Sequence, residues 1–169
     1  KNSRLRDYPF LAQGEFTYQH TGKKLNAVNV LAKVADNQLT LQGDLGAQAA
    51  KLHYRIHAPT ISQLHPDATG AIDAEGDFFG EWAHPSLVTR FTGQNLRWKT
   101  LAIQKTQGQL QLAQGLQGEA TGSVRVDGLQ YDQLLFQQVM LDIAGTRQQH
   151  EVRLTAQSAG KLLTEVRAN

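Results

Sequence analysis

Apolar and polar side chains alternate with a period of two along most of this chain. In segment 15–19 the order is Glu, Phe, Thr, Tyr, Gln, so that an aromatic ring recurs at every second position. Successive side chains of a β-strand point to opposite faces of its sheet, and this pattern therefore predicts a strand with one dry and one wet face. The same alternation recurs in segments 27–30, 38–42, 52–57, 109–112, 123–127, 141–143 and 151–155. We expect an all-β chain of antiparallel strands.

Residues that tolerate positive φ separate these segments, as at Asp36-Asn37, Asp127-Gly128 and Gly145-Thr146. Such pairs favour tight turns between antiparallel strands. Helix signals are few. Residues 59–64 begin with a proline and predict one or two helical turns. Residues 45–51 are rich in alanine and fit either a second short helix or a hairpin connection.

An internal repeat appears when residues 95–104 are laid over residues 128–137, an offset of 33 residues. Each copy reads Leu, any residue, an aromatic residue, and then a further run of alternating apolar positions. Repetition at a fixed period is typical of solenoids and long meanders. The chain is therefore expected to repeat a unit of two or three strands.

A sheet with one apolar face must cover that face with a second sheet, a helical layer, its own curvature or a ligand. Because helix signals are scarce, a β-sandwich, a closed barrel and a curled trough remain open as architectures. The dry positions are mainly Val, Leu, Ile, Phe and Tyr. Such an interior suits acyl chains better than sugars, nucleotides or peptides. The competing interpretation is an ordinary core packed against a partner sheet, since every antiparallel core produces alternation.

Composition narrows the classes of function. With 169 residues the chain is expected to form one unit, residues 1–169, rather than two domains. Its 17 basic and 15 acidic residues are scattered, so no basic stripe indicates nucleic-acid binding. The absence of cysteine excludes disulfides and thiolate zinc sites. No apolar run approaches the roughly 18 residues needed to cross a bilayer, and residues 1–8 show no export signal.

Carboxylates form the nearest approach to a catalytic or metal site. Asp73, Glu75 and Asp77 share one face of an expected strand, and Glu81 follows them. The spacing does not match an EF-hand, because Gly and Glu are missing from the required positions. We interpret these carboxylates as part of the wet face. The alternative that remains is the carboxylate pair of a carbohydrate-active enzyme.

The histidines form no zinc motif. His53 and His57 are four residues apart, which on a strand separates them by about 13 Å, too far to bind one metal ion. We interpret both as solvent-facing neighbours of Arg55. No Gly-x-Ser-x-Gly nucleophile elbow occurs. The sequence therefore predicts a protein that is not an enzyme and that has no cofactor and no metal site.

Two sequence motifs follow one another in the middle of the chain. The first is Ile56-His57-Ala58-Pro59-Thr60-Ile61-Ser62-Gln63-Leu64-His65-Pro66, which leads to Gly70 and Gly76; the second is His84-Pro85-Ser86-Leu87 followed by Gly93-Gln94-Asn95-Leu96-Arg97-Trp98. Their succession resembles the TamB family over about Leu39 to Leu154. The chain departs from the family pattern at Ile61, where Leu is commoner, and at residues 78–82, which are bulkier than usual.

The resemblance implies a large protein that is anchored in the inner membrane and crosses the periplasm of Gram-negative bacteria as a long curled β-sheet with an apolar trough. It implies work with the outer-membrane partner TamA in the assembly of outer-membrane proteins such as autotransporters. It also implies phospholipid traffic between the inner and outer membranes, as in AsmA-like proteins. This chain would be an internal or C-terminal periplasmic segment of such a protein.

We therefore expect an elongated, curled antiparallel sheet with an open groove that holds phospholipid acyl chains or unfolded outer-membrane protein strands. A second hypothesis is a protein-interaction module whose exposed sheet edges bind client strands by β-augmentation. The residues expected to line the groove are Phe16, Tyr18, Leu39, Leu41, Leu52, Tyr54, Ile56, Leu87, Phe91, Leu110, Leu112, Val124, Val126, Leu141, Ile143, Val152 and Leu154.

Overall fold

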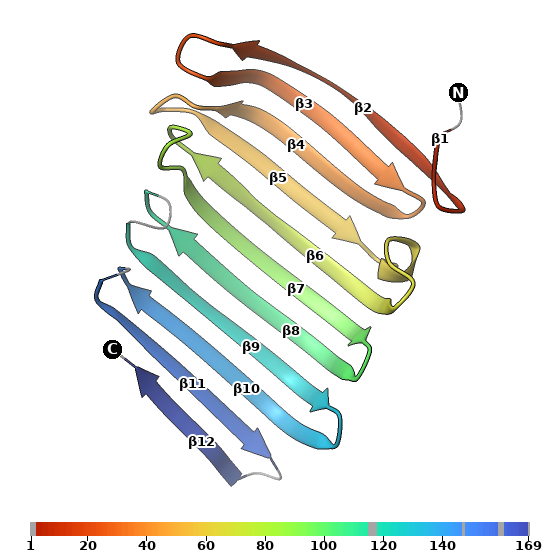
Figure 1. Ribbon diagram of the computed structural model, residues 1–169, viewed down its shortest axis with the longest axis vertical. Coiled ribbons are helices and arrows are strands. Elements are labelled where there is room, and N and C mark those ends of the chain that lie inside the picture. Colours follow the sequence, from red (N-terminus) through yellow and green to blue (C-terminus); the bar gives the residue numbers. More distant parts are fainter. Residues whose placement is uncertain (1–2, 115–117, 147, 159–160, 169) are drawn as a thin grey trace.

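The computed structural model describes residues 3–114, 118–146, 148–158 and 161–168, the last of these by their backbone alone. Most of them lie in strands of a single sheet (Figure 1). The elements are β1 (Ser3–Leu5), β2 (Tyr8–Gln19), β3 (Lys24–Val34), β4 (Asn37–Leu45), β5 (Lys51–Ala58), the 3-10 helix η1 (Ile61–Gln63), β6 (Ala68–Phe79), β7 (Ser86–Trp98), β8 (Leu101–Leu112), β9 (Ala120–Tyr131), β10 (Leu134–Gly145), β11 (His150–Ser158) and β12 (Lys161–Ala168).

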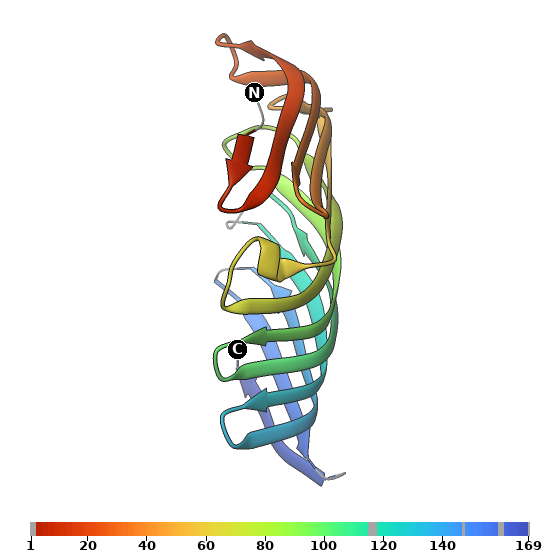
Figure 2. The same cartoon turned by 90° about the vertical axis from the view of Figure 1, so that its right-hand side faces the viewer.

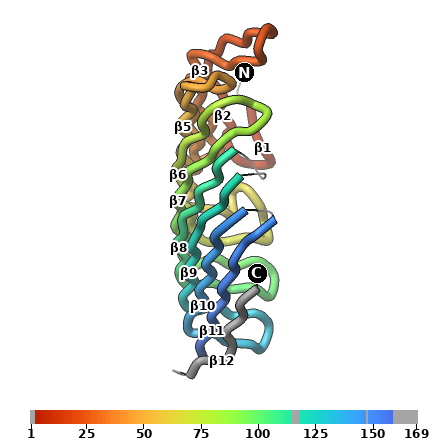
Figure 3. Tube along the Cα trace, turned by 90° about the vertical axis from the view of Figure 1, so that its left-hand side faces the viewer, coloured from red at the N-terminus to blue at the C-terminus, as the bar shows by residue number. Residues whose placement is uncertain are grey.

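The sheet is an open meander. Each strand pairs with the strands before and after it in the sequence, always antiparallel, and β1 and β12 form the two edges. Seen edge-on, the long strands are bent so that both of their ends lie on the same side of the sheet (Figure 2). The strands stack in sequence order along the length of the molecule (Figure 3). The predicted fold, an elongated and curled antiparallel sheet that leaves a groove open, is confirmed.

One helical turn interrupts the meander, as expected for residues 59–64. It is η1, and it is fastened to the β3–β4 turn by Asn37, a buried polar residue. The Asn37 amide donates to the Thr60 carbonyl at 3.0 Å and to Gln63 Oε1 at 2.9 Å, and its oxygen accepts the Thr60 N–H. Residues 45–51 hold no helix, and most of them form the connection between β4 and β5, which was one of the two alternatives.

The register of the strands separates two faces of different chemistry. Opposed residues of antiparallel strands share a face, so Tyr54 and Ile56 lie on the same face as Leu41 and Leu39. Asn37 also belongs to this face, because it is two residues before Leu39. Its side chain reaches the η1 segment, which lies on the hollow side of the sheet (Figure 2). The apolar face is therefore the concave face, and the polar face is the convex one.

Glycines on the concave face make room for large side chains of neighbouring strands. A Cβ atom on Gly76 would lie 2.8 Å from the Tyr54 ring and 2.3 Å from the Val88 carbonyl oxygen. A Cβ atom on Gly108 would lie 2.6 Å from the Phe91 ring. Side chains on the inside of a bent sheet are crowded, and positions without a side chain relieve that crowding. The glycines therefore permit the curl of the sheet.

The period of two slips by one residue in four successive strands, β7 to β10. Gln104 of β8, Gly128 of β9 and Gln137 of β10 fall at one level of the sheet, between the pairs that Leu129 and Asp127 form with β8 and β10. Gly128 has a φ of 64°. The turn predicted at Asp127-Gly128 is therefore wrong: the left-handed backbone forms an irregularity inside β9 instead of reversing the chain.

The slip keeps apolar residues on the concave face. The side chains of Leu96 and Thr106 both lie beside Gly93, which places Leu96 on this face. From Leu96 the register passes to Ile103 and Leu129. Apolar residues beyond the slip therefore stay on the concave side, although their numbers change from even to odd in β8 and β9 and from odd to even in β7 and β10.

The internal repeat corresponds to the hairpins β7–β8 and β9–β10. Asn95 and Gly128 both have positive φ at equivalent places inside the first strand of each hairpin. Lys99 and Asp132 have positive φ in the two turns. The repeated unit therefore has two strands, the smaller of the two sizes expected.

Substitution of Gly76 by Ala tests the role of the glycines in the curl. We expect the free energy of unfolding to fall by about 2 kcal/mol, because an added atom in a crowded site forces its neighbours to move. Urea denaturation followed by circular dichroism measures the change. Gln109→Ala, on the convex face, is the control and should change stability by less than about 0.5 kcal/mol. Equal small losses in both variants would contradict the crowding.

Candidate functional site

The concave face carries continuous rows of mainly apolar residues across the sheet. Each row runs perpendicular to the strands, through residues that the register places opposite one another. One row comprises Ile56, Ala74, Phe91, Gly108, Val124, Leu141 and Leu154. The next comprises Tyr54, Gly76, Thr89, Leu110, Gly122, Ile143 and Val152. With strands about 4.8 Å apart, these rows extend for about 30 Å.

All of the residues expected to line the groove lie on this face, from Phe16 and Tyr18 in β2 to Leu154 in β11. Their contact with lipid or client stays a prediction. Sequence reasoning missed other members of the face, among them the buried Val28 and Leu45. Val28 lies beside Ala27, whose positive φ breaks the alternation, so the pattern there did not show which face it occupies.

No second layer covers the concave face in the described part of the chain. None of the large side chains described is fully buried, and Phe16 remains 62% exposed. The best-packed group is Val28, Leu45 and Leu52 near the N-terminal end. The accessible surface is 11601 Å², whereas a compact domain of 18.7 kDa would expose about 8,300 Å². An apolar ligand could therefore reach this face without any opening movement.

Polar groups on the concave face bond to the protein itself. The Tyr54 hydroxyl and Thr89 Oγ1 form a hydrogen bond, and Thr89 Oγ1 also donates to the Glu75 carbonyl. Thr106 Oγ1 donates to the Arg125 carbonyl at 3.1 Å. No buried side-chain nitrogen or oxygen in the described residues lacks a partner. The concave face, which we call the floor of the trough, thus offers hydrocarbon contact and few free hydrogen-bonding groups.

The convex face carries a ladder of ion pairs between β5 and β6. His53 Nδ1 lies 2.8 Å from Asp77 Oδ1, and Lys51 Nζ lies 3.1 Å from Asp77 Oδ2. His57 Nδ1 lies 2.6 Å from Asp73 Oδ1. Basic residues alternate along β5 and acidic residues along β6, so the antiparallel register brings opposite charges together. This arrangement agrees with the interpretation of His53 and His57 as solvent-facing.

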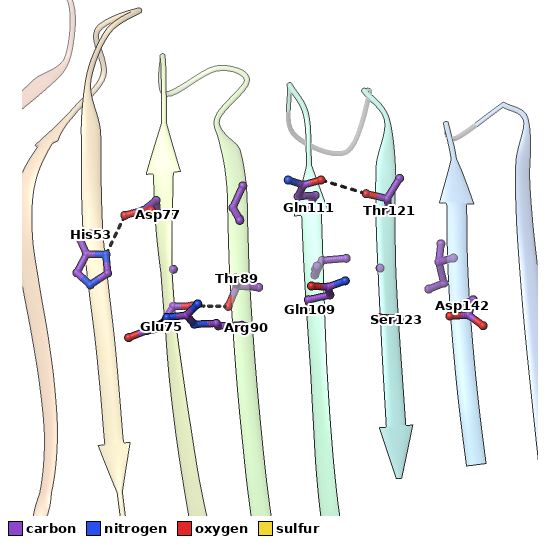
Figure 4. A pocket seen from close by; sticks show the side chains of 15 residues that line it. His53, Glu75, Asp77, Thr89, Arg90, Gln109, Gln111, Thr121, Ser123 and Asp142 are labelled. Carbon is purple, nitrogen blue, oxygen red and sulfur yellow. Dashed lines mark hydrogen bonds and ion pairs between the residues drawn. The ribbon is translucent and has the colours of Figure 1, made fainter. Parts of the chain in front are cut away.

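Glu75 occupies the middle of the ladder. It pairs with Arg55, at 3.7 Å, and with Arg90 of β7 (Figure 4). The expectation that Asp73, Glu75 and Asp77 share a face is confirmed by the register. Glu81 lies outside it, in the β6–β7 connection. No group of three His, Asp or Glu residues in the described part of the chain is placed to hold a metal ion.

The pKa of Asp77 lies below its ordinary value of 3.8. Partial burial acts to raise it, but the hydrogen bonds and charges of His53 and Lys51 together outweigh burial. The carboxylate is therefore held in its charged form by its two cross-strand neighbours.

A shallow hollow of about 690 Å³ lies on the convex face, between His53 and Asp142 (Figure 4). It is lined by polar side chains, among them Glu75, Arg90 and Gln109. Of its acidic residues, Glu75 pairs with Arg90 and Asp77 with Lys51, while Asp142 forms no ion pair among the described residues. We regard the uncovered concave face as the stronger candidate site, because it is far larger and its apolar groups lack cover.

The fold and this face define a class of protein: an open, curled antiparallel β-trough with an uncovered apolar floor. A family model described as the N-terminal domain of TamB matches residues 2–165. The chain belongs to the TamB family, which connects it with the assembly and transport of envelope components. The part of the family that matches is thus the N-terminal domain, whereas the sequence predicted an internal or C-terminal segment. No solved structure matches the chain.

No helix among the described residues has the length and apolar character needed to span a membrane.

Replacing Asp77 by Asn tests the ladder. At neutral pH we expect a loss of about 0.5 kcal/mol in the free energy of unfolding, because exposed ion pairs contribute little. Since folding lowers the pKa of Asp77, its contribution is present above pH 3.8 and is lost as the pH falls through the folded-state value. The difference between the two proteins in urea denaturation should therefore vanish in strong acid. Asp142→Asn, which removes no ion pair seen among the described residues, is the control; a difference that persists in acid would refute the assignment.

Proposed function

We propose that this chain is a section of an apolar β-trough that carries phospholipid acyl chains between the inner and outer membranes. The observation that supports the proposal is the continuous apolar concave face, which no other part of the described chain covers. Burial of each methylene group contributes about 0.8 kcal/mol, so an acyl chain gains several kcal/mol from contact alone. Binding of this kind selects hydrocarbon and ignores the headgroup.

Membership in the TamB family supports the cellular location and the partner that we propose for this function. We propose that the trough works in the periplasm, as a single β-trough segment, residues 1–169, of a larger protein anchored in the inner membrane. We further propose that its outer-membrane partner is TamA. In that setting the same surface would assist the assembly of outer-membrane proteins, including autotransporters, and the protein would act without catalysis.

A second candidate function rests on the edge of β2. The strand β1 pairs only with residues 8–10 of β2, so the edge from Leu11 to Gln19 has no neighbour among the described residues. Leu11, Phe16 and Tyr18 are exposed along it. An unpaired edge of this length is a template for an added strand. The alternative is therefore a chaperone-like module that binds client strands by β-augmentation.

Arginine substitutions on the floor test the lipid proposal. Leu112→Arg and Ile143→Arg should each lower the uptake of a fluorescent fatty acid several-fold, because a charge in an acyl groove disfavours hydrocarbon. The open trough lets the long side chain reach water, so the strand content should be partly retained. Fluorescence titration measures uptake, and circular dichroism measures the fold.

The matched control is Gln111→Arg, which places the same charge one residue away on the convex face. It should bind the fatty acid like the unmodified protein. Unfolding of the two floor variants in proportion to their loss of uptake would instead indicate an ordinary closed core.

Client binding is tested on delipidated protein. If the lipid proposal is correct, the protein takes up a fluorescent fatty acid. Added acyl chains then displace the fluorescent fatty acid from the protein. Protein that binds peptides from outer-membrane strands but never takes up the fatty acid would establish the β-augmentation function in its place. Thr17→Pro removes a backbone donor from β2 and should weaken peptide binding alone.

A further inference from the structure

One rim of the concave face ends in exposed aromatic and leucine side chains. The register joins Trp98, Leu101, Tyr131 and Leu134 in one row across β7–β10. The row lies where two-residue turns close the β7–β8 and β9–β10 hairpins, which follow one another along the same side of the sheet (Figure 1). We call these four residues the aromatic lip. A backbone hydrogen bond of 3.2 Å between the two turns holds the hairpins side by side.

The aromatic lip combines apolar surface with polar ends. Trp98 is 53% exposed and Tyr131 is 56% exposed. Neither the indole N–H nor the phenolic hydroxyl bonds to another of the described residues. Lys99 Nζ lies 5.3 Å from the centre of the Trp98 ring. Tryptophan, tyrosine and lysine together are the residues that proteins place at the boundary between hydrocarbon and lipid headgroups.

The opposite rim has a different character. The concave row next to it consists of Leu87, Leu112, Ala120 and Gly145. The connections beyond that row carry the acids Glu81 and Glu119, and the sequence between β10 and β11 adds one base, Arg147; the net negative charge disfavours a phosphate. In the two hairpin tips the base Lys99 stands against the single acid Asp132, and Arg97, between the concave residues Leu96 and Trp98, lies on the convex face. Over β7–β10 the row at the lip is therefore the more aromatic of the two. The opposite rim carries Trp82 in the β6–β7 connection, where it lines a hollow with Tyr18, Lys23 and Leu25.

We propose that the aromatic lip binds the glycerol-phosphate region of a phospholipid whose acyl chains lie on the concave floor. This inference rests on the proposed lipid-carrying function and adds an orientation to it. The lipid loads with its headgroup at the β7–β10 rim, where Lys99 faces the phosphodiester and the Trp98 and Tyr131 donors face the ester oxygens. The concave floor supplies the binding affinity, and the aromatic lip sets the orientation of the bound lipid.

The two tryptophans of the chain make the orientation measurable. Trp82 lies in the β6–β7 connection, at the opposite end of β7 from Trp98. Trp82→Phe leaves Trp98 as the only tryptophan, and Trp98→Phe leaves Trp82. Each variant is loaded from phosphatidylcholine vesicles that carry a nitroxide either on the headgroup or near the end of an acyl chain. The vesicles are then removed by flotation, so that only protein-bound lipid remains.

In the loaded protein the headgroup nitroxide should quench Trp98 several-fold more strongly than the chain-end nitroxide does. Trp82 should show no such preference. Bound lipid that quenches Trp98 mainly from the chain end, or quenches both tryptophans alike, overturns the lip but leaves the trough function standing. Quenching that disappears with the vesicles while lipid stays bound overturns it as well, because the lip then docks on a membrane surface. Failure of any lipid to remain with the protein overturns the trough function itself.

A charge reversal provides an independent readout. Lys99→Glu should lower the uptake of phosphatidylglycerol several-fold and leave the uptake of diacylglycerol, which lacks a phosphate, unchanged. Lys105→Glu introduces the same change on the convex face and should affect neither lipid. Equal losses for the two lipids in the Lys99 variant would show a structural defect and overturn phosphate binding at the lip.

Discussion

A sheet face made largely of Val, Leu, Ile and Phe is unfavourable in water, and the described part of this chain has no second layer to cover it. The backbone ladder between successive antiparallel strands carries the fold instead, because every strand from β3 to β11 is paired on both sides. Curling brings the inner side chains together and buries each of them in part. The remaining apolar surface is what makes the face available to a ligand.

Curvature depends on where side chains are absent. Gly76 and Gly108 let the rings of Tyr54 and Phe91 lie over neighbouring strands, so the sheet bends toward its apolar side. Neighbouring strands shift their alternation by one residue at the same level, that of Gly128. The apolar residues beyond this irregularity therefore still point to the concave side. Both devices shape an open groove. A barrel would need the first and last strands to pair, and the order of strands shows that they do not.

The sequence predicted much of this architecture because strand alternation is a local property. Strand identity, the dry face and the helical turn at residues 59–64 were all readable from it. The turn expected at Asp127-Gly128 was wrong, since one left-handed residue serves a bulge as well as a turn, and only the pairing partner distinguishes them. The ladder between Lys51–His57 and Asp73–Asp77 was also missed as a unit. Its signal, alternating bases in one strand and acids in the next, becomes informative once the register is known.

The two faces divide the physical tasks of the molecule. Ion pairs on the convex face join β5, β6 and β7 without using any apolar side chain. Polar groups on the concave floor bond to the protein, as Thr89 and Thr106 do, so the floor cannot tell one headgroup from another. A ligand that binds there stabilises the folded sheet by mass action. Any discrimination between lipids must therefore arise at the rims, where donors such as the Trp98 indole face solvent and charges differ from one side to the other.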